Sequence, residues 1–119
     1  MNVEDLRIYC ISKVHVSESF PFDESTLVFK VADKMFALVG LERIPHAVNV
    51  KCNPDLAVDL REKYSSVTPA FHMNKKHWNT ILLASEMSTE EIKKWIDHSY
   101  DLVVNSFTKK KQKELGFIK

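Results

Sequence analysis

The stretch AFHMNKKHWNTILL, residues 70–83, concentrates side chains that can do chemistry. Its polar and aromatic members are His72, Asn74, Lys75, Lys76, His77 and Trp78. Imidazoles can ligate a metal or transfer a proton. Ammonium and amide groups can bind an anion, and an indole can stack on a base. The rest of the sequence must supply the partners that each of these functions needs.

Metal coordination and acid–base catalysis lack those partners. A zinc site needs a third ligand beside the two histidines, and no Cys pair, His-Glu-x-x-His motif or Asp cluster provides one. A catalytic base needs a nucleophile, and Ser65 and Ser66 have no distinctive surroundings. Cys52 precedes a predicted helix, where a thiol can gain thiolate character, but a packed structural thiol fits it as well. Neither glycine begins a helix after a strand, which excludes the common nucleotide-binding loops. The sequence therefore predicts no catalytic set, no metal and no cofactor.

Composition indicates one globular domain spanning residues 1–119. Hydrophobic residues make up 45% of the chain and charged residues 28%, as is typical of an ordinary folded domain. No apolar run approaches the roughly 20 residues that cross a bilayer. The N-terminus is acidic rather than basic and then apolar, so no export signal is expected. Two cysteines far apart in sequence are typical of reduced thiols, and we expect a cytoplasmic protein.

Charge is balanced overall but unevenly distributed. The chain has 17 Lys and Arg against 16 Asp and Glu, a net of +1. Residues 109–119 contain five lysines and one glutamate, so this segment carries +4 and the remainder −3. A duplex-binding protein usually presents a broad basic field. This chain instead has basic patches on a slightly acidic body, and its C-terminal lysines fit either a solvated helix end or a nucleic-acid contact.

Caps and periodicity predict a two-layer α+β sandwich. Helices are expected from Asn2 to about Val16, from Asn53 to Tyr64, and from Ser88 towards Leu115, with Gly116 as the stop. Strands are expected at residues 26–31, 34–40, 46–52, 67–73 and 77–83. The order α-β-β-β-α-β-β-α predicts an antiparallel sheet of about five strands with the helices packed on one face.

Alternation along the strands predicts which side chains remain on the open face. We expect the open face to gather Lys30, Asn49, Lys51 and His72, and with them His77 and Asn79. Phe71 and Met73 are assigned to the covered face, and Trp78 is expected to anchor its hairpin in the core. Lys34 lies in a strand that is apolar on both faces, so its side is not assigned. Residues 74–77 read as an exposed turn with Lys75 and Lys76 in water. Such a face is either an ordinary solvated surface or a surface for anionic groups.

Four stretches together resemble the MmcQ/YjbR family: VFKVADKMFAL, VNVKCNPDLAVDLREKY, TPAFHMNKKHWNTILL and EEIKKWIDHSYDLVVNSFTKKKQKEL. The resemblance covers nearly the whole chain. It implies a CyaY-like or secretion-chaperone-like α+β fold, a bacterial cytoplasmic protein, and DNA binding through a double-wing arrangement. It carries over no catalytic residues. The family-like polar positions are Lys30, Lys34, Lys51, Asn53, His72, Lys75, His77, Trp78 and Asn79.

Three functions follow as hypotheses. The first is a non-enzymatic DNA-binding module that uses Lys30, Lys34, Lys51, His72, Asn74, Lys75, Lys76, His77, Trp78 and Asn79. The second is a protein-interaction or chaperone-like domain without a nucleic-acid role, which pairs through a sheet edge or forms a homodimer through apolar residues of the open face. The third is a small-molecule or enzymatic site around Lys51, His72 and His77, which requires these three side chains to share a pocket.

Overall fold

A computed structural model describes all of residues 1–119 and contains four helices and six strands. In chain order these are α1 (Val3–Ile11), β1 (Val16–Ser19), β2 (Thr26–Val31), β3 (Lys34–Gly40), β4 (Ala47–Lys51), α2 (Pro54–Lys63), β5 (Val67–Pro69), β6 (Trp78–Leu82), α3 (Thr89–Ser106) and α4 (Lys109–Glu114). The strands form one antiparallel sheet in the order β1-β2-β3-β4-β6-β5. The predicted α+β class is confirmed, with six strands where about five were expected.

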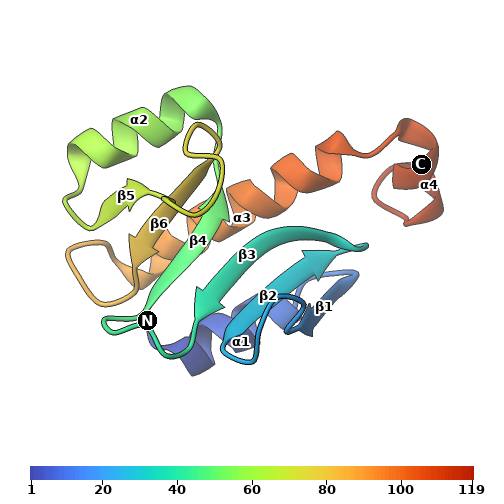
Figure 1. The fold of residues 1–119 in the computed structure, drawn as a ribbon. Helices are drawn as coiled ribbons and strands as arrows, with labels where there is room; N and C mark the ends of the chain where they lie inside the picture. The colour runs from blue at the N-terminus through green and yellow to red at the C-terminus, as the bar shows by residue number, and fades with distance from the viewer.

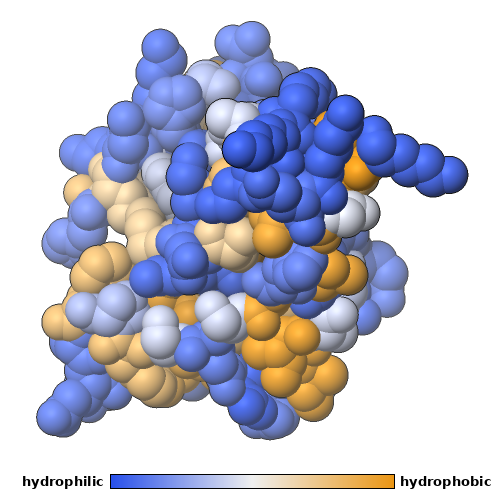
Figure 2. All heavy atoms as spheres, turned by 90° about the vertical axis from the view of Figure 1, so that its right-hand side faces the viewer, coloured by the Kyte–Doolittle hydropathy of each residue, from blue (hydrophilic) through white to orange (hydrophobic).

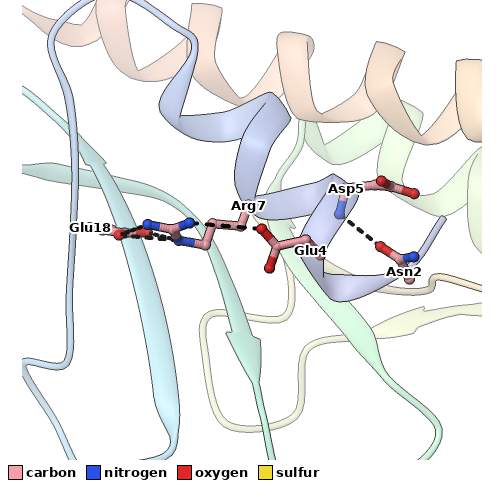
Figure 3. A network of polar contacts seen from close by, with 5 residues as sticks. All are labelled: Asn2, Glu4, Asp5, Arg7 and Glu18. Atoms are coloured by element: carbon pink, nitrogen blue, oxygen red, sulfur yellow. Dashed lines mark hydrogen bonds and ion pairs between the residues drawn. The ribbon is translucent and has the colours of Figure 1, made fainter.

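The additional strand is β1, which the sequence analysis placed at the end of the first helix. Helix α1 ends at Ile11, and His15 adopts a left-handed backbone conformation with φ of 63° that stops the helix from continuing. Arg7 of α1 then holds β1 through Glu18, with donor–acceptor distances of 2.7 and 2.8 Å (Figure 3). The chain therefore turns back as an edge strand on β2 instead of extending the helix.

The helices cover one face of the sheet, and the main core lies between the two layers (Figure 1). Helix α1 contributes Leu6 and Cys10, α2 contributes Ala57 and Leu60, and α3 contributes a continuous apolar stripe that includes Ile92, Ile96 and Val103. No helix is long and apolar enough to cross a membrane. The opposite face carries only a small apolar cluster made of Val28, Leu38, Ala70 and Trp78.

Strands β3 and β4 pair over only part of their length. Their ladder covers Ala37–Val39 and Val48–Val50, and the strands diverge beyond it (Figure 1). The hydroxyl of Ser99, fully buried on α3, occupies the gap. It accepts a hydrogen bond from the Lys51 amide at 2.8 Å and donates one to the Phe36 carbonyl at 2.5 Å. We call this end of the sheet the forked end and the opposite end, at Gly40 and Ala47, the closed end.

The C-terminal helix is broken where the sequence analysis expected it to continue to Leu115. Phe107 is extended, with ψ of 154°, and buries its ring. Thr108 then caps α4 by accepting a hydrogen bond from the Lys111 amide at 3.1 Å. The C-terminal lysines therefore belong to a separate short helix beside the forked end, where the Lys34 and Lys111 ammonium groups both lie over the Phe107 ring.

His98 of α3 ties the helical layer to the start of α2. Its Nε2 accepts a hydrogen bond from the Asn53 amide at 3.1 Å, and its ring meets Trp95 edge-on at 5.3 Å. Burial and the nearby Lys94 lower the pKa of His98 below its ordinary value, although Asp101 acts in the opposite sense. Only the neutral imidazole can accept this bond.

We therefore expect acid to weaken the fold through His98. The unfolded chain takes up the proton near the ordinary histidine pKa of about 6.5, so this contribution is complete above that pH and is lost as the pH falls. Urea unfolding should show a smaller loss of stability between about pH 7.5 and 5.5 in His98→Gln than in the wild type. His72→Gln, which removes an exposed histidine, is the control and should keep the wild-type loss. Equal losses in all three proteins would contradict this role.

Candidate nucleic-acid interface on the open face

The open face contains a cleft whose floor is one row of residues across four strands. Leu38 of β3 pairs with Asn49 of β4, Asn49 with Thr80 of β6, and Thr80 with Thr68 of β5. All four side chains line the cleft, which has a volume of about 940 Å³. Thr80 donates its hydroxyl hydrogen to Asn49 Oδ1 at 2.6 Å. This pair fixes the polar centre of the floor.

Two connections form the walls of the cleft. Residues 20–25 join β1 to β2 and place Phe22 and Asp23 in its lining, and residues 70–77 join β5 to β6 and place Phe71, His72, Met73 and Asn74 there. The Asp23 carboxylate accepts hydrogen bonds from the Ser25 and Thr26 amides at 2.9 and 2.7 Å. These bonds lower the pKa of Asp23, because they stabilise its carboxylate form, and they hold residues 23–26 in the turn that forms this wall.

Loop 70–77 is ordered by Asn74 and Trp78. The Asn74 carbonyl accepts hydrogen bonds from the His77 and Trp78 amides, and its side chain accepts one from the Lys76 amide at 3.0 Å. Trp78 is 9% exposed and packs into the small open-face cluster under the loop. The loop therefore presents Lys75 and Lys76 outward from a folded turn, and the Lys75 ammonium lies over the Phe71 ring at 5.3 Å.

Arg61 of α2 clamps the same loop from the helical side. Its Nε donates to Asn79 Oδ1 at 2.7 Å, and its second guanidinium nitrogen donates to the Lys75 carbonyl. Asn79 is fully buried and donates in turn to the Ala57 carbonyl at 3.3 Å. Every polar atom of the Asn79 carboxamide thus contributes to holding α2, β6 and the loop together.

Charge separates along the strand direction. The connections at the closed end contain four carboxylates, on Asp23, Glu24, Glu42 and Glu86, and one cation, Arg43. The forked end has Lys30 and Lys34 on one arm and Lys51, Lys75 and Lys76 on the other, with four lysines in α4 beside it. These cations outnumber the nearby carboxylates, which are Asp33, Asp55 and Glu114. Figure 2, which looks onto the α4 side of the molecule, shows hydrophilic side chains covering the upper part of this surface above separate hydrophobic patches. The forked end is therefore basic, although the net charge of the whole chain is only +1.

Several predicted site residues lie on the open side or on the loop that rises from it. Asn49 and Lys51 alternate with the buried Val48 and Val50, which places them on the open face. His72 and Asn74 line the cleft, although they belong to the loop and not to a strand reaching residue 73. Lys30 alternates with core residues Phe29 and Val31 in the same way.

Three predicted site residues differ from the rest: Asn79 and His77 require correction, and Lys34, whose side was not assigned, is placed by the structure. Asn79 lies on the covered face, because it pairs with the buried Val50 and its side-chain oxygen accepts a hydrogen bond from Arg61 of α2. Strand β6 thus turns Trp78, Thr80 and Leu82 to the open side, the reverse of the predicted assignment. Lys34 lies over Phe107 at the end of α3.

His77 is the third. It is half-buried at the end of the loop, does not line the cleft, and offers its carbonyl to the Cys52 amide at 2.7 Å. The hypothesis of a shared pocket for Lys51, His72 and His77 therefore fails, since only His72 of the three lines the cleft.

The sequence analysis missed Phe22, Arg43, Thr68 and Phe71 as lining residues. Phe71 and Met73 were assigned to the covered face, but both line the cleft, and Phe71 is 66% exposed. The assignment failed because β5 ends at Pro69 and the alternation stops there. The signal available in the sequence was the position of Phe22 between Pro21 and Asp23 and of Phe71 two residues after Pro69, where a core residue is not required.

The cysteines and histidines do not assemble a reactive centre. Burial raises the pKa of Cys10 to about 12 and that of Cys52 to about 11, although Lys13 and Arg61 respectively oppose these shifts. Both thiols are packed in the main core, as the structural alternative predicted for Cys52. No group of three or more His, Cys, Asp or Glu side chains is arranged to hold a metal ion.

These features define a class of small α+β domain with one helix-covered sheet face and one open, cleft-bearing face. The YjbR family model matches residues 11–102. The chain is 35% identical to the uncharacterized protein YjbR of Escherichia coli K12 over 97% of its own length and 98% of that protein. It is 33% identical to the uncharacterized protein YbdF of Escherichia coli O157:H7 over 81% and 79% of the two chains. The chain belongs to the YjbR family, as the sequence resemblance predicted.

Solved structures agree with this assignment. The crystal structure of a Deinococcus radiodurans protein with a DUF419 domain superposes with a TM-score of 0.91 at 39% identity, covering 97% of this chain and 88% of that one. A crystal structure of a Pseudomonas syringae protein gives a TM-score of 0.74 at 30% identity, covering 86% and 98%.

We expect the Arg61 clamp to control the order of loop 70–77. Arg61→Ala leaves the buried Asn79 oxygen without its donor, which should lower the free energy of unfolding by about 1–3 kcal/mol. It should also accelerate hydrogen exchange at the His77 and Trp78 amides. Lys63→Ala, which removes one positive charge from the same helix, is the control and should change neither quantity. Identical exchange in Arg61→Ala and Lys63→Ala would show that the loop does not depend on the clamp.

Proposed function

We propose that this protein is a non-enzymatic DNA-binding module that uses the open face and loop 70–77. The observation that carries the proposal is the concentration of lysines at the forked end, where the loop projects Lys75 and Lys76 beside Lys51. Phosphate contacts by lysine and arginine supply most of the non-specific affinity for DNA. The basic end, and not the overall net charge, sets the local field that a phosphate backbone meets.

Preorganisation of the loop supports the same proposal. Asn74 holds the turn from within, and Arg61 holds the Lys75 carbonyl from α2. A loop that is already folded loses little conformational freedom when it binds. The lysine side chains can then pair with phosphates without first ordering the backbone.

The proposed contact residues are therefore a corrected set. Lys30, Lys51, His72, Asn74, Lys75 and Lys76 remain as contacts. Asn79, His77 and Trp78 act as supports of the loop and strand, since they are buried or half-buried. Lys34 joins the lysines of α4 as a more distant source of positive potential, because it lies on the far side of the arm that bears Lys30.

A protein-interaction role is the second candidate, favoured by the exposed apolar side chains in the closed-end connections. Phe20, Phe22 and Ile44 are 48%, 65% and 78% exposed. Exposed apolar groups of this size often mark an interface. Pairing of two copies through these residues would make a homodimer, and sedimentation equilibrium would then show a dimer that Phe22→Ser or Ile44→Ser dissociates. A monomer at all concentrations would remove the homodimer form of this candidate.

Replacing the loop lysines should weaken DNA binding and reduce its salt dependence. Each lysine that releases a counterion from duplex DNA contributes about 0.9 to the slope of log affinity against log salt. The double variant Lys75→Ala/Lys76→Ala should therefore lower the slope by about 2. Fluorescence anisotropy with a labelled duplex, starting at about 50 mM salt, measures it.

The control for this experiment is Lys93→Ala/Lys94→Ala, which removes the same charge from α3 on the helical side. It should leave the slope close to that of the wild type. Equal slopes for the loop variant and the wild type would exclude loop 70–77 as a phosphate contact. Absence of binding to both duplex and single strand at low salt would exclude the proposed function.

A further inference from the structure

The cleft lining contains several hydrogen-bond donors without a protein partner. The side-chain oxygens of Asn49 and Asn74 accept from Thr80 and from the Lys76 amide, and neither carboxamide nitrogen donates to another protein group. The Thr68 hydroxyl and the His72 ring, which also line the cleft, can donate or accept. The Arg43 guanidinium at the rim forms no hydrogen bond or ion pair with the protein. The one carboxylate in the lining, Asp23, is already occupied by Ser25 and Thr26.

The walls of the cleft add flat apolar surface to these donors. Phe22 and Phe71 stand on different connections and are 65% and 66% exposed, although both line the same cavity. Met35, Leu38, Ala47 and Met73 complete the apolar part of the lining. Thioether side chains adapt to flat ligands of varied outline. Exposed phenylalanine rings offer their faces to a stacking partner at no cost in broken core packing.

A cation accompanies the aromatic group at one wall. The Lys75 ammonium lies 5.3 Å from the centre of the Phe71 ring. A ligand stacked on the other face of Phe71 would thus bring an attached anionic group close to Lys75. The cleft volume of about 940 Å³ is within the range of sites for compact ligands. Donors, ring faces and a neighbouring cation match a flat heterocycle that bears acceptor atoms and a phosphate.

We infer that the cleft accepts an unpaired base of a nucleic-acid strand, with the base on Phe71, its phosphate at Lys75, and Phe22 as a second aromatic wall of the same cleft. This inference rests on the proposed DNA-binding function and makes single-stranded segments the preferred form. A base inside a duplex is stacked on both faces and paired at its edge, so neither Phe71 nor the Asn49 amide could reach it. Single-strand binding folds combine stacking aromatics with a basic path in the same way.

The test measures the binding of single-stranded and of duplex DNA to the wild type, to variants of the cleft phenylalanines and to a control variant. A labelled thymidine oligonucleotide of about 12 residues, within the site sizes of single-strand binding domains, is titrated by anisotropy beside a duplex of equal length. The oligonucleotide should bind more tightly than the duplex. Phe71→Ala and Phe22→Ala should each weaken its binding by about 5- to 150-fold, the range expected for loss of one stacked base, and should leave duplex binding nearly unchanged.

Phe20→Ala is the matched control, because Phe20 is an exposed phenylalanine of the same connection that does not line the cleft. It should bind the oligonucleotide as the wild type does. Phe71→Trp, which retains a ring, should restore the affinity lost in Phe71→Ala. Unaltered thermal unfolding of the alanine variants separates loss of stacking from loss of fold.

The alternatives give different outcomes. Equal binding of duplex and oligonucleotide, insensitive to Phe22 and Phe71, would overturn the inference and leave the proposed function standing. Thymidine monophosphate is added as a competitor at a concentration equal to that of the nucleotides in the oligonucleotide. If it displaces the oligonucleotide, the cleft binds a free nucleotide and the inference of a strand is overturned. Absence of binding to either form of DNA at about 50 mM salt would remove the proposed function together with the inference.

Discussion

The hydroxyl of Ser99 determines where the sheet opens. The buried hydroxyl bridges the Lys51 amide and the Phe36 carbonyl at the point where β3 and β4 part, so both backbone groups remain hydrogen-bonded where the ladder between the strands ends. Without this bridge two buried polar groups would lack partners, and each orphaned group costs on the order of 1–3 kcal/mol. Because Ser99 belongs to α3, the packing of the longest helix and the fork in the sheet depend on each other.

The fork and the one-sided helical layer together create the open face. With α1, α2 and α3 all buried against the same side, no element covers Leu38, Asn49, Thr80 and Thr68 on the other. Loop 70–77 rises from the forked end over that face, held from behind by Arg61. The arrangement therefore places hydrogen-bond donors, aromatic rings and lysines on the same uncovered side of the sheet.

Much of the fold could be predicted because local signals agreed with the tertiary structure. Strands 26–31 and 34–40 and the caps at Asn53 and Ser88 lie where periodicity placed them. Two of the failures depended on a contact between residues from different elements, whereas the break of the last helix depends on the local cap that Thr108 gives to α4. Strand β1 depends on Arg7 and Glu18, and the inward position of Asn79 depends on Arg61. The open face was expected to be polar, but the position of Phe71 in its cleft depends on where β5 ends.

Mapping of backbone amide chemical shifts by NMR during titration with a thymidine oligonucleotide tests the central claim most directly. The claim is that nucleic acid binds to the uncovered face, across the cleft and the lysines of loop 70–77. The largest changes should fall on residues 70–77, Asn49 and Thr80, while amides on the outer surface of α3 stay unchanged. Changes concentrated on α3, or on α4 alone, would contradict the account.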